Sequence, residues 1–356
     1  MAFFLIICIY FKSLTIKSIK NSYSDESLNM IENFQRVKLG HFPTPIEHLK
    51  SISDYLAGPQ IYIKRDDCTG LATGGNKTRK LEFILADALD KNANLIVTVG
   101  AIQSNHARQT AAACAKLGLK CLIILEHRLK NAPKIYETSG NVFLNKLFGA
   151  ELIYCPKDEV IEDYADQIID ERTLKGEKPY FIPVGGSNHF GELGYIECMR
   201  EIIENQNQDS FSHIVLATGS GGTQAGLIAG KTIYQSDTKI IGISIARDKS
   251  TQETKVYQLA LNSLKYVQYD APLREDVIVE DGFVGSGYAE PTQGMRDALS
   301  LMAIKEGILL DPVYSGKAFD GLVGLIKSNF FKPSDKVLFL HTGGSAAIPA
   351  FEWAFE

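Results

Sequence analysis

The feature that most constrains the fold is a series of eight short apolar runs between residues 61 and 341, separated by stretches with helical periodicity. Several runs are almost continuously apolar, which is typical of strands buried on both faces in a parallel sheet covered by helices. The alternation predicts an α/β fold of mostly parallel twisted sheets flanked by helices, with two sheets. The runs are IYIKRD (61–66), LIVTVG (95–100), CLIILE (121–126), LIYC (152–155), YFIPVG (180–185), HIVLATG (213–219), KIIGISIA (239–246) and KVLFLH (336–341).

The stretch after the first run shows the helical periodicity best. Leu81, Ile84, Leu85, Ala88 and Leu89 recur at the spacing of one helix face, so we expect a helix whose apolar side is buried. The 356 residues are more than a single core usually takes. Because no proline- or glycine-rich linker divides the chain, we expect two domains that are interleaved along the sequence.

Composition and charge exclude several kinds of partner. The net charge is -5 without a long basic stripe, so a nucleic-acid partner is not expected. The apolar segment 1–11 is shorter than the ~20 residues that a membrane span needs, and it lacks the flanks of a signal peptide. We therefore interpret residues 1–29 as a non-structural extension and expect no membrane partner.

The cysteines form no CxxC pair, which is typical of reduced, buried cysteines in a cytoplasmic protein; they are Cys8, Cys68, Cys114, Cys121, Cys155 and Cys198.

The first candidate site is the glycine-rich turn Gly74-Gly75-Asn76-Lys77, which leads into the predicted helix. Lys77 lies four residues before Leu81 and therefore on the face that is expected to be buried. Burial and the positive end of a helix both lower the pKa of a lysine. Neutral lysine is the form that attacks an aldehyde to give a Schiff base. On this segment alone, a lysine that simply extends its charge to solvent remains an open alternative.

The second candidate site follows the apolar run 95–100. A helix is expected to begin near Ser104, so that Ser104 and Asn105 cap it and leave backbone N–H groups pointing outward. Such a helix start is a suitable site for the carboxylate of an amino acid. A helix cap with a purely structural role is the alternative.

The third candidate site is the segment TGSGGTQAG (218–226), between an apolar run and an apolar helix. Its glycines let the backbone surround an anion, and the start of the helix favours phosphate. It is not a Walker loop, because no GK[ST] closes it. It also departs from the dinucleotide fingerprint, because Gln224 occupies the place of the third glycine. A close-packed turn without a ligand is the alternative.

The fourth candidate site lies near the C-terminus, where Tyr288 and Tyr314 stand beside glycines in predicted loops and His341 ends the last apolar run. Tyrosines in this setting can stack on a ring or transfer protons. Taken singly, they are also common packing residues, so their role stays open at this level.

Together, these segments resemble the tryptophan-synthase-β-like, or type II, pyridoxal-phosphate enzymes. Within that class, GGNKTRKLE, IQSNHARQTAA, GSGGTQAG, DPVYSGK and HTGG are similar to the branch of D-cysteine desulfhydrases and 1-aminocyclopropane-1-carboxylate (ACC) deaminases. The resemblance runs from about Val37 to about Trp353. It implies a two-domain type II fold with a large cofactor domain of residues 30–79 and 190–356, a small domain of residues 80–189, and a homodimer.

The resemblance also implies roles for individual residues. Lys77 would form the Schiff base with pyridoxal phosphate, Asn105 would bond the ring hydroxyl, and Lys80 would add a charge to the phosphate cradle. Further cofactor contacts are implied for Ser220, Gly221, Gly222, Thr223, Ser315 and Thr342. Substrate contacts are implied for Ser104, Asn105 and His106, and catalytic roles for Lys77, Ser104, Tyr288 and Tyr314. No metal ion is expected.

Two positions distinguish the members of the branch. ACC deaminases carry a glutamate where this chain has Ser315 and a leucine where it has Thr342. The resemblance therefore favours a D-cysteine desulfhydrase, which converts D-cysteine and water to pyruvate, hydrogen sulfide and ammonia. An ACC deaminase and a cysteate sulfo-lyase remain alternatives within the branch. A nicotinamide oxidoreductase and a non-catalytic amino-acid-binding protein are the alternatives outside it.

Overall fold

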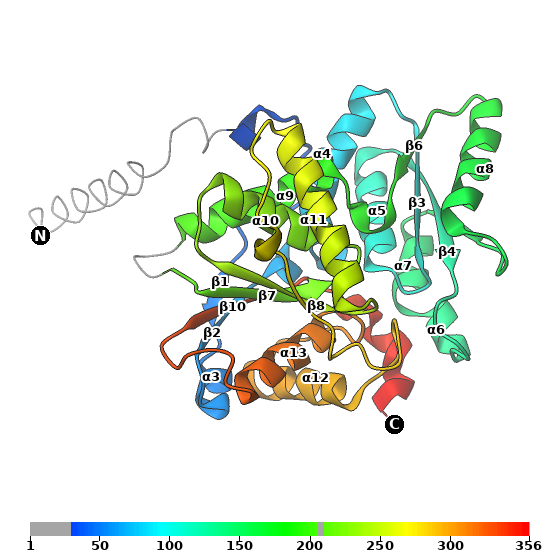
Figure 1. Ribbon diagram of the computed structural model, residues 1–356. Helices are drawn as coiled ribbons and strands as arrows, with labels where there is room; N and C mark the ends of the chain where they lie inside the picture. Colours follow the sequence, from blue (N-terminus) through cyan, green and yellow to red (C-terminus); the bar gives the residue numbers. More distant parts are fainter. Residues whose placement is uncertain (1–29, 206–209, 356) are drawn as a thin grey trace, which may run out of the picture.

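The computed structural model describes residues 30–205 and 210–355, which form two sheets with helices on both faces (Figure 1). The larger sheet has the order β1-β2-β10-β7-β8-β9 and the smaller one β5-β4-β3-β6. All neighbouring strands are parallel except β1 and β2, which confirms the predicted fold class. The strands are β1 (Ile46–His48), β2 (Gln60–Lys64), β3 (Leu95–Ala101), β4 (Lys120–Glu126), β5 (Glu151–Tyr154), β6 (Pro179–Ile182), β7 (His213–Thr218), β8 (Lys239–Ser244), β9 (Ile278–Glu280) and β10 (Lys336–Leu340).

The helices form layers on both faces of each sheet. In Figure 1, α9, α10 and α11 cover one face of the larger sheet, and α3, α12 and α13 cover the other. The α-helices are α3 (Lys50–Leu56), α4 (Lys77–Asp90), α5 (Asn105–Leu117), α6 (Lys134–Thr138), α7 (Gly140–Leu147), α8 (Ile161–Leu174), α9 (His189–Glu204), α10 (Gly222–Ile233), α11 (Lys249–Tyr266), α12 (Gln293–Glu306) and α13 (Ser315–Lys327). The short 3₁₀ helices are η1 (Met30–Asn33), η2 (Asp66–Cys68), η3 (Leu71–Thr73), η4 (Val184–Gly186), η5 (Arg274–Asp276) and η6 (Ser345–Phe355).

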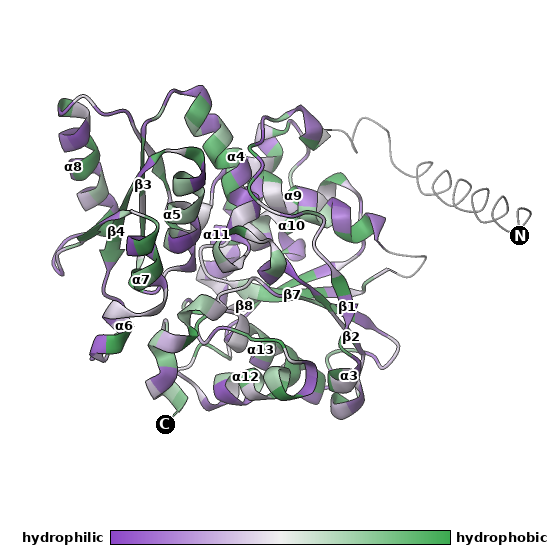
Figure 2. Cartoon of the chain, turned by 180° about the vertical axis from the view of Figure 1, so that it is seen from behind, coloured by the Kyte–Doolittle hydropathy of each residue, from purple (hydrophilic) through white to green (hydrophobic). Residues whose placement is uncertain are grey.

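The central strands are apolar on both sides because helices cover both faces of the sheet. On β7, Ile214 and Leu216 pack against the layer of α9 and α10, whereas Val215 packs against the layer of α12 and α13. β7 therefore has hydrophobic colour along most of its length in Figure 2. Two short edge strands, β1 and β9, were not predicted, because three residues are too few to show a pattern.

The predicted division into domains can be compared with the two sheets. The smaller sheet is built from residues 95–182, inside the segment predicted as the small domain, whereas the strands of the larger sheet lie outside it. The predicted boundary at residue 80 falls inside α4. The division into domains stays a prediction, and the predicted extension of residues 1–29 lies outside the described residues.

Two expectations about single residues are wrong. Cys68 is exposed rather than buried, although the other four described cysteines are buried; all five are free thiols. Leu89 on α4 is 38% exposed, because the helix turns this position away from the core near its end. Within the described residues, none of the helices combines the length and apolar character that a membrane span requires.

Candidate active site

A cavity lies where the two sheets meet, at the carboxyl ends of β3, β7 and β10. In parallel α/β sheets, ligands bind at this edge, outside the strand ends. The cavity brings together most of the residues singled out from the sequence, namely Lys77, Ser104, Asn105, His106, Ser220, Gly221, Thr223, Tyr288, Tyr314 and Thr342. Lys80, Gly222 and Ser315 do not line it.

Lys77 is the first residue of α4 and is half-buried at the cavity wall. The preceding turn needs Gly74 and Gly75, whose φ angles are 75° and 132°. Asn76 fixes the turn, since its N–H donates to the carbonyl oxygen of Thr342 (3.1 Å) and its Nδ2 donates to Thr223 Oγ1 (2.9 Å). Burial lowers the pKa of Lys77 well below its ordinary value, and the positive charge of Lys80 lowers it further. The lowered pKa enlarges the neutral fraction of the amine, which is the form that attacks an aldehyde.

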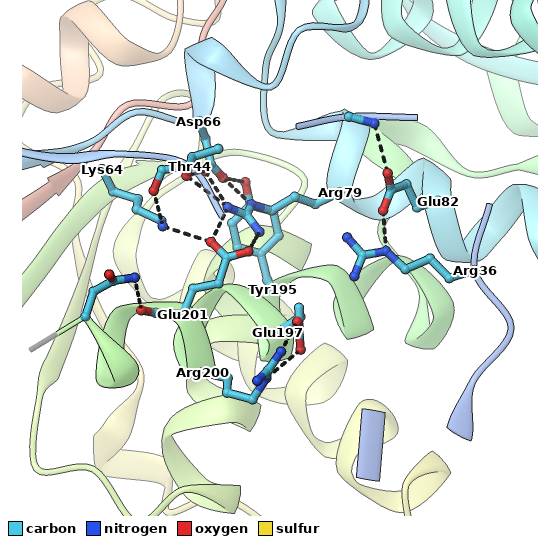
Figure 3. Close-up of polar contacts among 12 residues, drawn as sticks. Arg36, Thr44, Lys64, Asp66, Arg79, Glu82, Tyr195, Glu197, Arg200 and Glu201 are labelled. Carbon is cyan, nitrogen blue, oxygen red and sulfur yellow. Dashed lines mark hydrogen bonds and ion pairs between the residues drawn. The ribbon is translucent and has the colours of Figure 1, made fainter. Parts of the chain in front are cut away.

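The helix that carries Lys77 is held by a buried network of charges (Figure 3). Arg79 lies two residues after Lys77 and donates to Asp66 Oδ2 at 2.8 Å and to Glu201 Oε1 at 2.8 Å. Lys64 donates to Glu201 Oε2 at 2.8 Å. All four of these side chains are buried, and their two positive and two negative charges balance. No periodic pattern along the chain predicts this network, because its members come from β2, η2, α4 and α9.

The predicted phosphate loop joins β7 to α10. Gly221 has a φ of 94°, and a Cβ atom on Gly222 would lie 2.6 Å from Ser187 Oγ and 2.8 Å from Lys80 Nζ. The Ser187 hydroxyl and the Lys80 amine therefore lie close against the backbone at the start of α10, the end of the helix that favours an anion. Lys80 Nζ donates to the carbonyl oxygen of Gly185 (3.1 Å) and to Ser187 Oγ (3.3 Å), which places a cation beside this loop.

Ser187 is a residue of this loop region that sequence reasoning missed. Its hydroxyl donates to Ser220 Oγ at 2.8 Å and accepts from the N–H of Gly222 at 3.3 Å. A second glycine-rich turn, Gly185-Gly186-Ser187, follows β6 and was the available signal. The apolar run predicted for residues 180–185 ends at Gly185, so the pattern does not separate this turn from the strand before it.

The predicted helix start after β3 is present. Ser104 is the N-cap of α5, and its Oγ accepts from the N–H of Ala107 at 3.1 Å. Asn105 Oδ1 accepts from Asn141 Nδ2 at 2.8 Å, so the side chain of Asn105 offers its NH₂ group as a donor to the cavity. The N–H groups that begin a helix have no acceptor inside the helix, which makes this wall suitable for a carboxylate.

The two candidate tyrosines form a pair. Their hydroxyl oxygens lie 2.8 Å apart, and their rings meet edge to face with centroids 6.1 Å apart. Burial raises the pKa of both Tyr288 and Tyr314. Both are therefore neutral at pH 7, and one hydroxyl donates to the other.

Ser315 and Thr342 lie in different surroundings. The hydroxyl of Ser315 donates to Asp311 Oδ1 (2.7 Å) and accepts from the N–H of Asp311 (2.7 Å), and the residue is 1% exposed. Thr342 lines the cavity and is 7% exposed. The structure therefore brings Thr342, but not Ser315, to the cavity together with Lys77.

Comparison with known families accounts for this arrangement of a half-buried lysine beside an open helix start. A sequence profile of pyridoxal-phosphate dependent enzymes matches residues 37–343. The chain belongs to this family. Members depend on pyridoxal phosphate, so this chain is a PLP-dependent enzyme.

Individual members of the PLP-dependent family match nearly the whole chain. The D-cysteine desulfhydrase of Serratia proteamaculans (strain 568) is 43% identical over 328 residues, which cover 90% of this chain and 97% of the relative. The D-cysteine desulfhydrase of Salmonella typhi is 41% identical over 329 residues, which cover 91% and 98%. A solved structure of an ACC deaminase homologue superposes with a TM-score of 0.85 at 37% identity and covers 93% of this chain and 98% of its own.

Proposed function

We propose that this chain is a D-cysteine desulfhydrase that converts D-cysteine and water to pyruvate, hydrogen sulfide and ammonia. The observation that carries the proposal is one cavity in which a lysine of lowered pKa, two helix starts and a pair of tyrosine hydroxyls face the same space. The names and the near full-length match of the curated relatives support this substrate.

The residues present fit pyridoxal phosphate. We propose that Lys77 would hold the cofactor through its aldehyde carbon and that Ser220, Gly221, Gly222 and Thr223 would hold its phosphate. Lys80 Nζ lies close to the Gly222 backbone, which supports this arrangement. Its positive charge would lie next to the doubly charged phosphate of the cofactor. When bound, the cofactor withdraws electrons from the α-carbon and so allows the α-proton to leave.

The substrate roles follow from the walls of the cavity. The carboxylate is proposed to bind at the start of α5, near Ser104, Asn105 and His106, where helix N–H groups are free. The amine of Lys77 is proposed to accept the α-proton, because burial lowers its pKa and so enlarges the neutral fraction that can act as a base. The tyrosine pair stays protonated and is suited to donate a hydrogen bond to the leaving sulfur.

The partner of the ring nitrogen decides how much negative charge the cofactor can store. We propose that this partner is the Thr342 hydroxyl, because the hydroxyl of Ser315 is already occupied by Asp311. A carboxylate partner keeps the ring nitrogen protonated, whereas a hydroxyl partner does not. Elimination of a good leaving group needs less charge storage than opening a cyclopropane, which supports desulfhydrase activity over ACC deaminase activity.

Comparing substrates tests the proposal. We expect kcat/KM for D-cysteine to exceed that for ACC by orders of magnitude when both, with L-cysteine and L-cysteate, are assayed on one holoenzyme preparation. ACC as the best of the four substrates would contradict the argument from the hydroxyl. L-Cysteate as the best would preserve elimination but identify a sulfo-lyase, the second alternative.

We also propose that the protein is a cytoplasmic homodimer. The resemblance to the family supports the dimer, and the free cysteines accord with a reducing compartment. Light scattering after size-exclusion chromatography tests the oligomeric state, and a monomer at micromolar concentration would contradict this proposal.

A further inference from the structure

The cavity wall that carries the tyrosine pair also carries Arg128, a cation to which the roles above assign nothing. Arg128 follows β4 and lines the cavity. Its Cζ lies 5.6 Å from the centroid of the Tyr288 ring, which is within the range of a cation–π contact. Its side chain is 33% exposed, so a ligand in the cavity mouth can reach it.

The charges that line the cavity are predominantly positive. Arg128, Arg247 and Lys255 line it together with Lys77, and Glu162 is the only carboxylate among its described lining residues. Glu126 partly balances Arg128, with Oε2 2.6 Å from Nε. Arg247 is directed to the phosphate side, since Nη1 donates to the carbonyl oxygen of Gly219 at 2.9 Å. Arg128 is thus a cation on the tyrosine side of the cavity, in contact with the Tyr288 ring.

The remaining walls leave one direction for the substrate side chain. In the proposed function, the start of α5 takes the carboxylate, Lys77 takes the amino group, and the start of α10 takes the cofactor phosphate. The free wall is the one formed by Tyr288, Tyr314 and Arg128. The substituent on the β-carbon therefore faces a hydroxyl donor backed by a guanidinium.

We propose that Arg128 determines specificity for amino acids whose β-substituent departs as a basic anion, such as hydrosulfide, or already carries a negative charge, such as sulfonate. This inference rests on the proposed function and deepens it. In the elimination step, Lys77 takes the α-proton, the carbon–sulfur bond breaks, and its electron pair goes to sulfur. The resulting anion forms beside the Tyr288 hydroxyl and the Arg128 charge, which stabilise it in a partly desolvated site.

Paired substrates test the specificity role. Chloride is a weakly basic anion, so β-chloro-D-alanine needs little stabilisation of its leaving group, whereas D-cysteine needs more. In Arg128→Gln, kcat/KM for D-cysteine is expected to fall at least tenfold and that for β-chloro-D-alanine at most threefold. Arg128→Lys should recover part of the loss. An equal fall for both substrates would indicate a merely structural role and overturn the proposal.

A matched control is available outside the cavity. Arg274 also lies over a tyrosine ring, with Cζ 4.9 Å from the centroid of Tyr257, but it does not line the cavity. Arg274→Gln should leave both kcat/KM values unchanged. Failure of wild-type holoenzyme to act on D-cysteine would contradict the proposed function, and the binding experiment below would still test Arg128.

Equilibrium binding provides a readout that does not need turnover. 3-Sulfopropanoate has a carboxylate and a sulfonate but no amino group, so it cannot react with the cofactor; butanoate replaces the sulfonate with an apolar end. Calorimetry on holoenzyme should show a Kd for 3-sulfopropanoate that rises about tenfold in Arg128→Gln, while the Kd for butanoate is unchanged. An unchanged Kd for 3-sulfopropanoate would overturn the proposal.

Discussion

The hydroxyl of Thr98 donates to the carbonyl oxygen of Ile182 at 2.8 Å and therefore accepts the proton on Nε2 of His106, which lies 2.8 Å away. This pair of contacts sets the tautomer of a histidine that lines the cavity. Nδ1 of His106 is buried and has no hydrogen-bond partner among the described residues. Burial lowers the pKa of His106 well below its ordinary value, and the charges of Lys77 and Lys80 act in the same direction. The imidazole is therefore a neutral acceptor at pH 7.

Replacing Thr98 with valine should remove the contact that keeps the proton of His106 on Nε2. Nitrogen NMR of labelled wild-type protein, with His106→Gln for assignment, should show Nε2 protonated and Nδ1 unprotonated from pH 5.5 to pH 8.5. In Thr98→Val, the two nitrogens should no longer have fixed roles, because Nε2–H loses its buried acceptor, at a cost of ~1–3 kcal/mol in the free energy of unfolding. Titration of wild-type His106 near pH 6.5 would contradict the assignment.

Replacing Lys77 with alanine should abolish the covalent attachment of pyridoxal phosphate. Borohydride reduction of wild-type holoenzyme followed by peptide mass analysis should find the cofactor on Lys77, because its lowered pKa makes it the reactive amine. Lys80, the neighbouring lysine, provides the comparison. A reduced adduct on Lys80 in wild type, or an unchanged visible absorption in Lys77→Ala, would show that another amine holds the cofactor.

The affinity for the cofactor phosphate should fall at alkaline pH. Burial lowers the pKa of Lys80 to about 8, although the Glu192 carboxylate opposes this effect. The phosphate requires the charged form of Lys80, so binding must take up a proton above pH 8 and weakens by up to about tenfold per pH unit. Pyridoxine phosphate is the suitable probe, because it lacks the aldehyde and does not report on Lys77. In Lys80→Arg, this pH dependence should vanish, and its persistence would exclude Lys80 as the cause.

A carboxylate in the glycine loop should repel the phosphate. Gly221→Asp is expected to raise the Kd for pyridoxal phosphate at least a hundredfold, because it places a negative charge at the start of α10. The residue also has a positive φ, so strain must be controlled for. Gly118, with a φ of 70° and no atom within 4 Å of its added Cβ, offers that control. If Gly118→Asp raises the Kd for pyridoxal phosphate as much as Gly221→Asp does, the negative charge at the loop is not the cause of the weaker binding.

Arg79→Met should destabilise the protein strongly. Burial alone would raise the pKa of Asp66, but Arg79, with smaller contributions from Lys64 and the Tyr195 hydroxyl, holds it below its ordinary value. Removing Arg79 leaves two buried carboxylates with Lys64 as the one cation of the network, at a cost of ~3–5 kcal/mol in the free energy of unfolding at pH 7. Arg200→Met, which breaks partly exposed pairs with Glu197 and Glu204, should cost about 1 kcal/mol or less.

The difference in the free energy of unfolding between wild type and Arg79→Met should depend on pH, and its sign follows from the lowered pKa of Asp66. A carboxyl group with a lowered pKa in the folded state stabilises the protein above its unfolded pKa of about 3.9 and loses this contribution as the pH falls further. Urea unfolding at pH 7 and at pH 3 should therefore show a smaller gap between wild type and Arg79→Met at pH 3. A gap that grows on acidification would contradict the sign of the shift.

The sequence predicted those parts of the site that are local in the chain. Ser104 as a helix cap and Lys77 at a helix start could be identified because the cap and the apolar stripe occupy neighbouring positions. Contacts between distant segments could not be identified in this way. Arg79 reaches Glu201 across 122 positions, and Arg128 meets Tyr288 only because the end of β4 faces a loop after β9. A sequence pattern gives such residues no distinguishing spacing.

The position of Ser315 shows a further limit of inference from sequence alone. The motif around Tyr314 placed Ser315 one residue along the chain, and hence beside the expected cofactor ring. In the fold, Ser315 begins α13, and its hydroxyl turns to Asp311 instead of to the cavity. Position in a motif does not determine the direction of a side chain, because the backbone geometry at a helix start can turn neighbouring side chains to opposite sides.

The place of β10 in the larger sheet has a consequence for biosynthesis. Among the described strands, β10 is the last in sequence, yet it lies between β2 and β7, and the segment that follows it supplies the Thr342 carbonyl that anchors Asn76. While the ribosome is still translating, the nascent chain therefore cannot close this sheet or complete the turn before Lys77. Prematurely terminated products that lack β10 would expose the apolar edges of two central strands, as substrates for chaperones and proteases. The turn before Lys77 is thus completed only in chains whose synthesis has passed residue 342.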